Sequence, residues 1–357
     1  MTESEQANLP RWRGQAGFYE FWFVVVFEPD EGRAYWFRYT ILSPAEGIAT
    51  SPAATLWAAF FDVRWPGPVA FKRVLPLAGF ECGPRDRFEI GLGSARLGQG
   101  HCSGEGAVGS RRWGWDLRFV PASVSEHLEP ALLRLVPLSA GVARPNADVE
   151  FEGTVTIDGA RRRIERAPGL QFHAWGTRLP DELRWVRCPR FVEDASARLE
   201  ALSVRLDRRL PGGITAPWLS PISLRARGGD VHLTSLLDVV RSGSAVHGIG
   251  EVVFRGASWG KEVHVRAWCD PRTLAGYVYR DPRGRELYVA QSDIGSCEIE
   301  RRSRPHPLAG WRDAGRLTNR GSTAIEFHAP EPLAGIDYIP WEAEEPPARP
   351  GMAMEIR

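Results

Sequence analysis

The sequence predicts an all-β fold, organised as two antiparallel β-barrels packed together. Short stretches rich in aromatic and β-branched residues recur along the 357 residues. Gly, Pro, Asp and Asn separate them at the short, regular spacing that is typical of barrels and sandwiches and not of βαβ folds. Two windows 164 residues apart also share the pattern strand, acidic turn, strand. This offset is about the length of one barrel domain.

The first half contains the clearest strands. Phe18–Phe27 and Ala34–Leu42 flank the turn residues Glu28–Gly32 and therefore predict a hairpin. One helix is expected in this half, over Ser125–Leu135. A hairpin turn is expected at Asp158-Gly159, because this dipeptide suits a two-residue loop. The remaining strands are expected over residues 56–63, 69–75, 113–119 and 149–157.

The second half repeats the pattern. We place the boundary near Pro180, which gives an N-terminal barrel over 18–179 and a C-terminal barrel over 180–341. The polar residues 1–17 and the acidic, Pro-rich residues 342–357 are expected to be flexible tails. Strands are expected over residues 183–191, 199–206, 219–227, 231–239, 246–254, 263–268, 275–279, 286–290, 296–301 and 323–328.

The composition is that of an ordinary globular protein. Hydrophobic residues make up 43% and charged residues 25%, and the formal net charge is +1. A nucleic-acid or membrane-surface protein would carry a clear basic excess, so neither partner is expected. The longest apolar run, Phe21–Phe27, is far shorter than the roughly 20 residues of a transmembrane helix. The sequence does not determine the oligomeric state.

The cysteines favour a cytoplasmic protein. There are five, they are widely spaced, and no two form a C-x-x-C pair, so neither a disulfide framework nor a zinc site is expected. The eight histidines form neither H-E-x-x-H nor H-x-H, and we expect no metal. The polar N-terminus has no apolar signal segment.

Two glycine motifs are interpreted as turns. Gly104–Gly109 matches G-x-G-x-x-G, but a dinucleotide site needs this motif to open a helix, and here a strand follows. Gly256–Gly260 matches the G-x-S-x-G of serine hydrolases, which also requires a following helix, and the alternating pattern of Lys261–Trp268 predicts a strand. We therefore expect no nucleotide cofactor and no serine nucleophile.

Tryptophan is in excess, with fourteen copies. Large core fillers account for part of this number. The rest are expected to line a cavity for a large flat or polyene ligand, since an indole buries a large apolar surface. The expected lining residues are Trp22, Trp36, Trp57, Trp115, Trp175 and Trp185.

The stretch Gly169–Gly176 (GLQFHAWG) concentrates polar chemistry next to the proposed boundary. Gln171, His173 and Trp175 are two residues apart, so on a strand they share one face. This row could form the polar floor of a pocket. The alternative is a structural histidine bonded to a loop carbonyl, which is the commoner role of a buried histidine.

Other polar candidates lie on the predicted strands. Glu20 and Arg38 are expected to form a buried ion pair inside the first barrel, because a buried charge needs a partner. His101 and Asp116 are further interior candidates. However, alternation places Trp115 and Asp116 on opposite faces, so Asp116 faces solvent if the indole faces the core.

These residues resemble a known superfamily. The opening hairpin, the W-x-x-x-F-D segment Trp57–Asp62, the Gly-rich residues 98–106 with Trp115-Asp116-Leu117, and the G-x-Q-x-H-x-W-G stretch are similar to the twin lipocalin-like proteins. That superfamily includes carotenoid 1,2-hydratases (hydroxyneurosporene synthases), AttH-like proteins, tocopherol cyclase-like proteins and fungal pericyclases. The resemblance implies two lipocalin-like (calycin) barrels around a hydrophobic pocket, and a cofactor-free reaction.

The chain departs from the hydratases at one point. They carry an Asp-Arg pair directly before the W-G of the stretch, where this chain has His173-Ala174. Protonation of an alkene needs a carboxylic acid kept neutral by burial. Glu20 is the first candidate for this acid and Asp116 the second, while His173 and Gln171 would orient water or a ligand carbonyl.

The predicted function is binding of a hydrophobic small molecule, either an isoprenoid, a polyene or a polyketide-like compound. Acid-catalysed hydration or cyclisation without a cofactor is the predicted reaction, which would make the protein a lyase or a cyclase. The alternative is a non-catalytic carrier with the same pocket, which the missing Asp-Arg pair favours. Arg38, Trp57 and His101 complete the expected set of ligand-binding residues.

Overall fold

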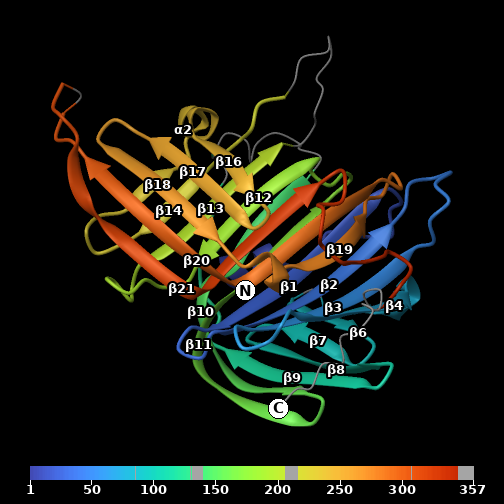
Figure 1. Cartoon of the computed structure of the whole chain (residues 1–357). Coiled ribbons are helices and arrows are strands. Elements are labelled where there is room, and N and C mark those ends of the chain that lie inside the picture. The colour runs from blue at the N-terminus through green and yellow to red at the C-terminus, as the bar shows by residue number, and fades with distance from the viewer. Residues whose placement is uncertain (85, 129, 131–139, 206–215, 307, 345–357) are drawn as a thin grey trace.

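The computed structural model describes residues 1–84, 86–128, 130, 140–205, 216–306 and 308–344. Within these residues almost all regular structure is β-strand, in two large antiparallel sheets that follow one another along the chain (Figure 1). The predicted all-β class is therefore confirmed. The strands of the first sheet end at Gly176 and those of the second begin at Glu182.

The first sheet has 11 described strands in the order β4-β3-β2-β1-β11-β10-β9-β8-β7-β6-β5. Strands that are neighbours in this order are also consecutive in the chain, with one exception. The exception is the pairing of β1 with β11, which joins the first strand of the sheet to the last. The strands are β1 (Phe18–Glu28), β2 (Arg33–Ser43), β3 (Ala53–Asp62), β4 (Val69–Pro76), β5 (Phe80–Cys82), β6 (Glu89–Leu92), β7 (Ala95–Gly98), β8 (His101–Val108), β9 (Arg111–Phe119), β10 (Ala140–Ile157) and β11 (Ala160–Gly176).

The second sheet runs in the order β15-β14-β13-β12-β21-β20-β18-β17-β16, with β19 and β22 attached beside β20. Its β12–β21 pairing is the counterpart of β1–β11 in the first sheet. The strands are β12 (Glu182–Cys188), β13 (Arg198–Arg205), β14 (Ile222–Arg225), β15 (Val231–Leu233), β16 (Gly243–Gly248), β17 (Glu251–Ala257), β18 (Lys261–Trp268), β19 (Ala275–Arg280), β20 (Glu286–Ser303), β21 (Arg312–Ala329) and β22 (Tyr338–Ile339).

Several predicted elements differ from the structure. The expected strand 246–254 is divided between β16, which ends at Gly248, and β17, which begins at Glu251, and the two expected strands 286–290 and 296–301 are both part of β20. Residues 231–239 were expected to be one strand, but β15 ends at Leu233 and the helix α2 (Leu236–Arg241) follows. The cause is a capping box, in which Ser235 and Asp238 satisfy the first free N–H groups of the helix. Most of the helix expected over Ser125–Leu135 lies outside the described residues. Its described part contains only an isolated bridge, between Glu126 and Arg144.

Three hydrophobic clusters account for the core. One fills the first barrel and one the second, and a third lies where the outer faces of the two sheets pack together. Strand β1 belongs to two of them, because Trp22, Val24 and Val26 point into the first barrel while Phe23 and Val25 point to the second. Both faces of β1 are therefore buried, which explains why its sequence is a continuous apolar run.

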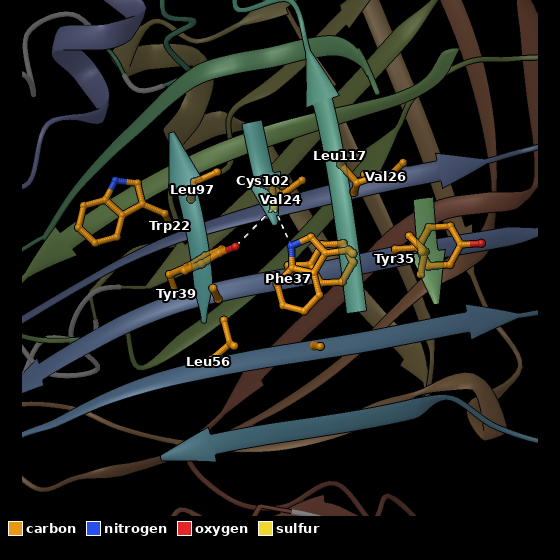
Figure 2. Packing of buried hydrophobic residues seen from close by; sticks show 14 of the residues in the cluster. Trp22, Val24, Val26, Tyr35, Phe37, Tyr39, Leu56, Leu97, Cys102 and Leu117 are labelled. Atoms are coloured by element: carbon orange, nitrogen blue, oxygen red, sulfur yellow. Dashed lines mark hydrogen bonds between the residues drawn. The ribbon is translucent and has the colours of Figure 1, made fainter. Parts of the chain in front are cut away.

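The interior of the first barrel is packed with side chains (Figure 2). The Tyr39 hydroxyl lies 3.5 Å from Cys102 Sγ, and Trp115 Nε1 donates a hydrogen bond to the same sulfur over 3.1 Å. The Trp115 ring also stacks on Phe37, with 4.1 Å between centroids. Trp22 and Trp115 are thus core fillers at the density of a protein interior, and neither lines a cavity.

A glycine lets one of these indoles approach the opposite strand. A Cβ built on Gly104 would lie 2.5 Å from the Trp115 ring and 2.9 Å from Ala95 Cβ. We expect Gly104→Ala to destabilise the protein by about 1–3 kcal/mol, because the ring is held on its other face and cannot move. Urea unfolding followed by tryptophan fluorescence would measure this. Gly243→Ala is the control, since nothing lies within 4 Å of its Cβ position; equal midpoints for the two variants would contradict the expectation.

The N-terminal segment differs from the expected flexible tail. It forms the helix α1 (Glu3–Asn8), which Thr2 caps, and this helix packs against β10. Ser4 and Asn8 are fully buried. Ser4 Oγ donates to the Pro145 carbonyl, and the side chains of Asn8 and Gln171 exchange hydrogen bonds over 3.0 and 2.7 Å. The polar composition of this segment thus supplies hydrogen bonds to the barrel. Of the C-terminal tail, residues 345–357 lie outside the described part.

Candidate functional site

A cavity of about 580 Å³ lies between the two barrels. Its walls come from β1, β2, β10 and β11 of the first sheet and from β12, β13 and β21 of the second. These strands lie around the centre of each sheet, where β1 pairs with β11 and β12 pairs with β21, and they contribute the outer faces of the two sheets. The size is within the range of sites for drug-sized ligands.

Seven Phe, Tyr and Trp side chains are among the described residues that line the cavity. Phe23 stacks on Phe172 with 4.8 Å between ring centroids and meets Trp185 edge-on at 6.0 Å. Trp36 and Trp175 also line the space. The indole nitrogen of Trp36 is buried and has no hydrogen-bond partner among the described residues. A ligand with an acceptor atom could use this donor, since buried N–H groups are nearly always paired.

The charged and imidazole side chains among the described lining residues are those of Arg11, Arg38, His127, Arg144, Glu326 and His328. Arg38, Glu326 and His328 belong to the facing strands of the two sheets. Arg38 is 5% exposed, and its guanidinium lies between the Phe21 ring, 3.7 Å from the centroid, and the Tyr279 ring, 4.0 Å away. Its Nε donates to Thr40 Oγ1 over 3.0 Å. On β21, Glu326 and His328 are two residues apart and so share one face, where they are joined through Glu326 Oε1 and His328 Nε2.

The other nitrogen of the histidine is free within the described part of the chain. His328 Nδ1 is buried and has no hydrogen-bond partner there. The His328 side chain is only 7% exposed and the Glu326 side chain 12%. A carboxylate that fixes one imidazole nitrogen leaves the second nitrogen oriented for proton transfer. The pair therefore has the arrangement of an acid–base group at the edge of the cavity.

A buried carboxyl lies in the layer next to this pair. Gln291 is the antiparallel partner of Glu326, and Asp293 follows it two residues later on β20. Gln291 Nε2 donates to both carboxyl oxygens of Asp293, each at 3.0 Å, and both residues are fully buried. Burial raises the pKa of Asp293 to about 7, although the hydrogen bond from Gln291 acts in the opposite direction. Asp293 does not line the cavity.

Glu20 and His173 form a separate polar cluster at the end of the first barrel that α1 covers. His173 Nε2 lies 2.8 Å from Glu20 Oε1, and His173 Nδ1 lies 2.7 Å from the Ala7 carbonyl. The backbone N–H groups of Arg11 and Trp12 donate to the two oxygens of Glu20 over 2.6 and 2.8 Å. Glu20 and His173 on the barrel strands thus hold the backbone of Ala7, Arg11 and Trp12. This cluster therefore fastens the N-terminal segment to the first barrel.

Loss of the Glu20 charge should release that segment. In Glu20→Gln an amide NH₂ would face one of the two backbone donors, leaving a buried group unpaired at a cost of about 1–3 kcal/mol. We expect trypsin to cleave after Arg11 and Arg13 at least several times faster than in the wild type, with the barrels intact. Mass spectrometry of a timed digest would measure this. Glu150→Gln is the control, because Glu150 pairs with Arg166 on the exposed surface; equal rates would contradict the anchoring role.

Four of the expected ligand-binding residues meet at the cavity, namely Trp36, Arg38, Trp175 and Trp185. The others lie elsewhere. Gln171 bonds to Asn8 and to Asn146 inside the first barrel. Trp57 packs edge-on against Tyr277 and Tyr279 between the sheets, beside the cavity and not on its wall.

Two of the sequence-based expectations, the Glu20–Arg38 pair and the interior position of His101, are wrong, whereas Asp116 faces solvent as the alternation predicts. Glu20 and Arg38 do not pair, because Arg38 lies opposite Phe23 on the outer face of the sheet while Glu20 shares the inner face with His173. His101 and Asp116 do pair, at 3.2 Å, but on the outer surface, with side chains 44% and 64% exposed. Neither lines the inter-barrel cavity, because β8 and β9 do not contribute to its wall.

Sequence reasoning missed Glu326, His328 and Asp293. The strand of Glu326 and His328 was predicted over 323–328, whereas Asp293 lies between the predicted strands 286–290 and 296–301. The position of Glu326 and His328 follows from the pairing of β21 with β12, which is far away in the chain. One signal was present: Gln291-x-Asp293 and Glu326-x-His328 each place two polar residues on one face of a strand whose neighbours are apolar. Buried polar pairs of this kind are costly and therefore mark a site.

Within the described residues, no group of three or more His, Cys, Asp or Glu side chains could hold a metal ion. No helix in that part of the chain is long and apolar enough to cross a membrane.

The chain has the twin lipocalin-like fold. An AttH-like protein from Nitrosomonas europaea superposes with a TM-score of 0.50 and 11% identity over 86% of this chain and 92% of its own. Kievitone hydratase from Nectria haematococca gives 0.51 and 7%, over 87% and 88%. CghA with Sch210972 gives 0.52 and 10%, over 92% and 93%. The resemblance predicted from the sequence is confirmed at the level of the fold.

The sequence relatives match this chain over most of its length, but their descriptions give no activity. Two proteins described as uncharacterized, MT0513 and Rv0493c from two strains of Mycobacterium tuberculosis, are each 22% identical to this chain over 325 residues, which is 90% of this chain and 92% of theirs. No protein-family model matches the chain.

Proposed function

We propose that this protein binds a hydrophobic small molecule in the cavity between its barrels and catalyses a cofactor-free, proton-assisted hydration or cyclisation of it. The observation that carries the proposal is the presence of Arg38, Glu326 and His328 on the wall of a mainly apolar cavity of about 580 Å³. A large apolar pocket with a few oriented polar groups is the usual form of a small-molecule site. Two proteins with this fold, a hydratase and CghA with Sch210972, are consistent with it.

Each polar group has a role that its surroundings suit. Arg38 is permanently charged and held between two rings, so it would polarise a ligand carbonyl or steady an enolate oxygen. The His328–Glu326 pair would move a proton to or from the ligand through the free nitrogen of His328. The rings of Phe21, Trp175 and Trp185 would stabilise positive charge that develops on an isoprenoid or polyene carbon.

The proposal replaces the proton donor expected from sequence. Glu20 accepts hydrogen bonds from two backbone N–H groups and contacts His173, and it does not line the cavity. His328, with Glu326 beside it, takes that role here. The buried Asp293 would tune the pair electrostatically from behind, because it lies close enough for Glu326 to affect its pKa.

Any molecule that co-purifies with the protein can be extracted and identified by mass spectrometry, which would give the substrate class. Prenyl, polyene and polyketide-like compounds would then be assayed for binding and conversion. Leu202→Trp should block binding by filling part of the cavity, because Leu202 lines the cavity next to Trp185, its cross-strand partner. Leu308→Trp is the matched control, since Leu308 is 94% exposed. Binding that survives Leu202→Trp would place the ligand elsewhere and overturn the proposal.

Glu326→Gln and His328→Phe separate catalysis from carriage. Both should keep binding and lower the rate of conversion by about 10²–10⁴-fold, the usual contribution of a general acid or base. A wild-type protein that binds the same compounds tightly and converts none of them would instead support the non-catalytic carrier.

A further inference from the structure

A second, polar cavity of about 280 Å³ adjoins the inter-barrel cavity. It lies between β10 of the first sheet and β12, β13 and β14 of the second, beside the segment 124–128. His127, Leu128 and Arg144 line both cavities. Arg144 contacts residues of both cavities, because its guanidinium pairs with Glu200 in the polar cavity and lies 5.1 Å from the centroid of the Phe172 ring in the inter-barrel cavity.

Four arginines and three carboxylates line this polar cavity among the residues that the structure describes, and they pair unequally. Three tight ion pairs account for six of them: Arg144–Glu200 at 2.7 Å, Arg198–Asp148 at 2.6 Å and Arg225–Glu126 at 2.7 Å.

The fourth arginine, Arg187, has only loose ion pairs, and among the described residues no carboxylate lies within hydrogen-bond distance of its guanidinium. Its nearest carboxylate oxygens, on Glu200 and Asp148, lie 3.9 and 4.0 Å away. Its guanidinium donates one hydrogen bond, to the Ala147 carbonyl, although it carries five N–H groups. Arg187 is 5% exposed, so water does not solvate it freely. A buried guanidinium with one partner is costly unless an anion completes it.

Ser125 provides an independent sign of a missing partner. It is 3% exposed and lines the same cavity. Its hydroxyl has no hydrogen-bond partner in the described part of the chain. Buried hydroxyls are rarely left unpaired. An acceptor that could reach both Ser125 Oγ and the Arg187 guanidinium would satisfy the two groups together.

We propose that the ligand of this protein is an apolar molecule that carries a carboxylate. Its apolar body occupies the inter-barrel cavity and its carboxylate sits in the polar cavity on Arg187 and Ser125. Among the described lining residues the arginines exceed the carboxylates by one, which suits a singly charged group, and the guanidinium fork of Arg187 matches the two oxygens of a carboxylate. The inference rests on the proposed function, because it places the body of the ligand in the cavity assigned there.

Retinoic acid and retinol test this, since they share a polyene body and differ in the charge of the end group. Quenching of tryptophan fluorescence in the full-length protein would give both affinities. We expect the wild type to bind retinoic acid about tenfold or more tightly than retinol, the value of a charge-assisted hydrogen bond. Arg187→Gln should abolish this preference and leave retinol binding unchanged. Ser125→Ala should weaken retinoic acid binding by a few-fold.

Arg163→Gln is the control for loss of one positive charge, because Arg163 is 81% exposed. The wild-type comparison and Ser125→Ala keep the test decisive if Arg187→Gln does not fold. If the wild type binds the two retinoids with equal affinity, the proposed carboxylate site is wrong, but the proposed binding of a ligand in the inter-barrel cavity is not contradicted. Tighter binding of retinyl phosphate than of retinoic acid would overturn the assignment to a carboxylate. Binding of neither retinoid would count against the proposed function itself.

Discussion

Glu200→Ala should destabilise the protein by about 3–5 kcal/mol, the largest effect we expect from a single side chain. Glu200 is 5% exposed and lies between two buried guanidinium groups, 2.7 Å from Arg144 and 3.9 Å from Arg187. It also accepts a hydrogen bond from Trp185 Nε1 over 3.2 Å. Its removal would leave two buried positive charges with no close counter-charge between them.

The ionisation of Glu200 supports this expectation. Burial alone would raise the pKa of Glu200, but Arg144 and Arg187 outweigh it and the pKa lies below its usual value. The stability that this carboxylate contributes is therefore present above its ordinary pKa and is lost as the pH falls through the lowered one.

Urea unfolding at pH 7 would measure the loss for Glu200→Ala. Glu165→Ala is the matched control, because Glu165 pairs with Arg163 at the exposed surface, where a salt bridge contributes about 0–1 kcal/mol. A loss below about 1 kcal/mol for Glu200→Ala would show that the arginines find other partners, and the charge balance of the polar cavity would have to be revised.

Asp293→Asn should stabilise the protein at alkaline pH. The pKa of Asp293 is raised from 3.8 to about 7 by burial. Between these two values the unfolded chain has lost the proton and the folded protein keeps it, so the contribution of Asp293 to stability falls as the pH rises. Above about pH 7 the fold contains a buried charge, at a cost on the order of 4 kcal/mol. Asn removes this charge and keeps an oxygen to accept from Gln291.

The measurement is the difference in unfolding free energy between Asp293→Asn and wild type at pH 5, 6, 7 and 8. We expect this difference to grow in favour of the variant across the series. Asp116→Asn is the control for loss of one carboxyl at the surface, where Asp116 is 64% exposed. A difference for Asp293→Asn that is constant with pH would mean that the carboxyl is ionised throughout, and its electrostatic role beside Glu326 would be excluded.

The strands were predictable because their chemistry is local. Phe18–Phe27 and Ala34–Leu42 are rich in β-branched and aromatic residues and are bounded by turn residues, and β1 and β2 match them closely. The face of a strand that meets each compartment was not predictable, because both faces of β1 are apolar. The expected Glu20–Arg38 pair failed for this reason: alternation defines two faces, and only the packing decides which is inside.

The site was predictable only in its aromatic part. Trp36, Trp175 and Trp185 could be proposed because an excess of indoles suggests a cavity in any arrangement. Glu326, His328 and Arg187 could not, since their meaning depends on which strands become neighbours. β12 meets β21 across more than a hundred residues of chain, and a single sequence contains no signal for such a long-range pairing.

Strand β1 separates the core of the first barrel from the inter-barrel cavity, and its alternate side chains point to opposite sides. Trp22, Val24 and Val26 belong to the core of the first barrel, whereas Phe21 and Phe23 line the inter-barrel cavity. The consequences of mutation along this strand should therefore alternate with a period of two, between loss of folding and loss of affinity. Two neighbouring positions, equally apolar and equally hidden from solvent, are thus subject to entirely different selection.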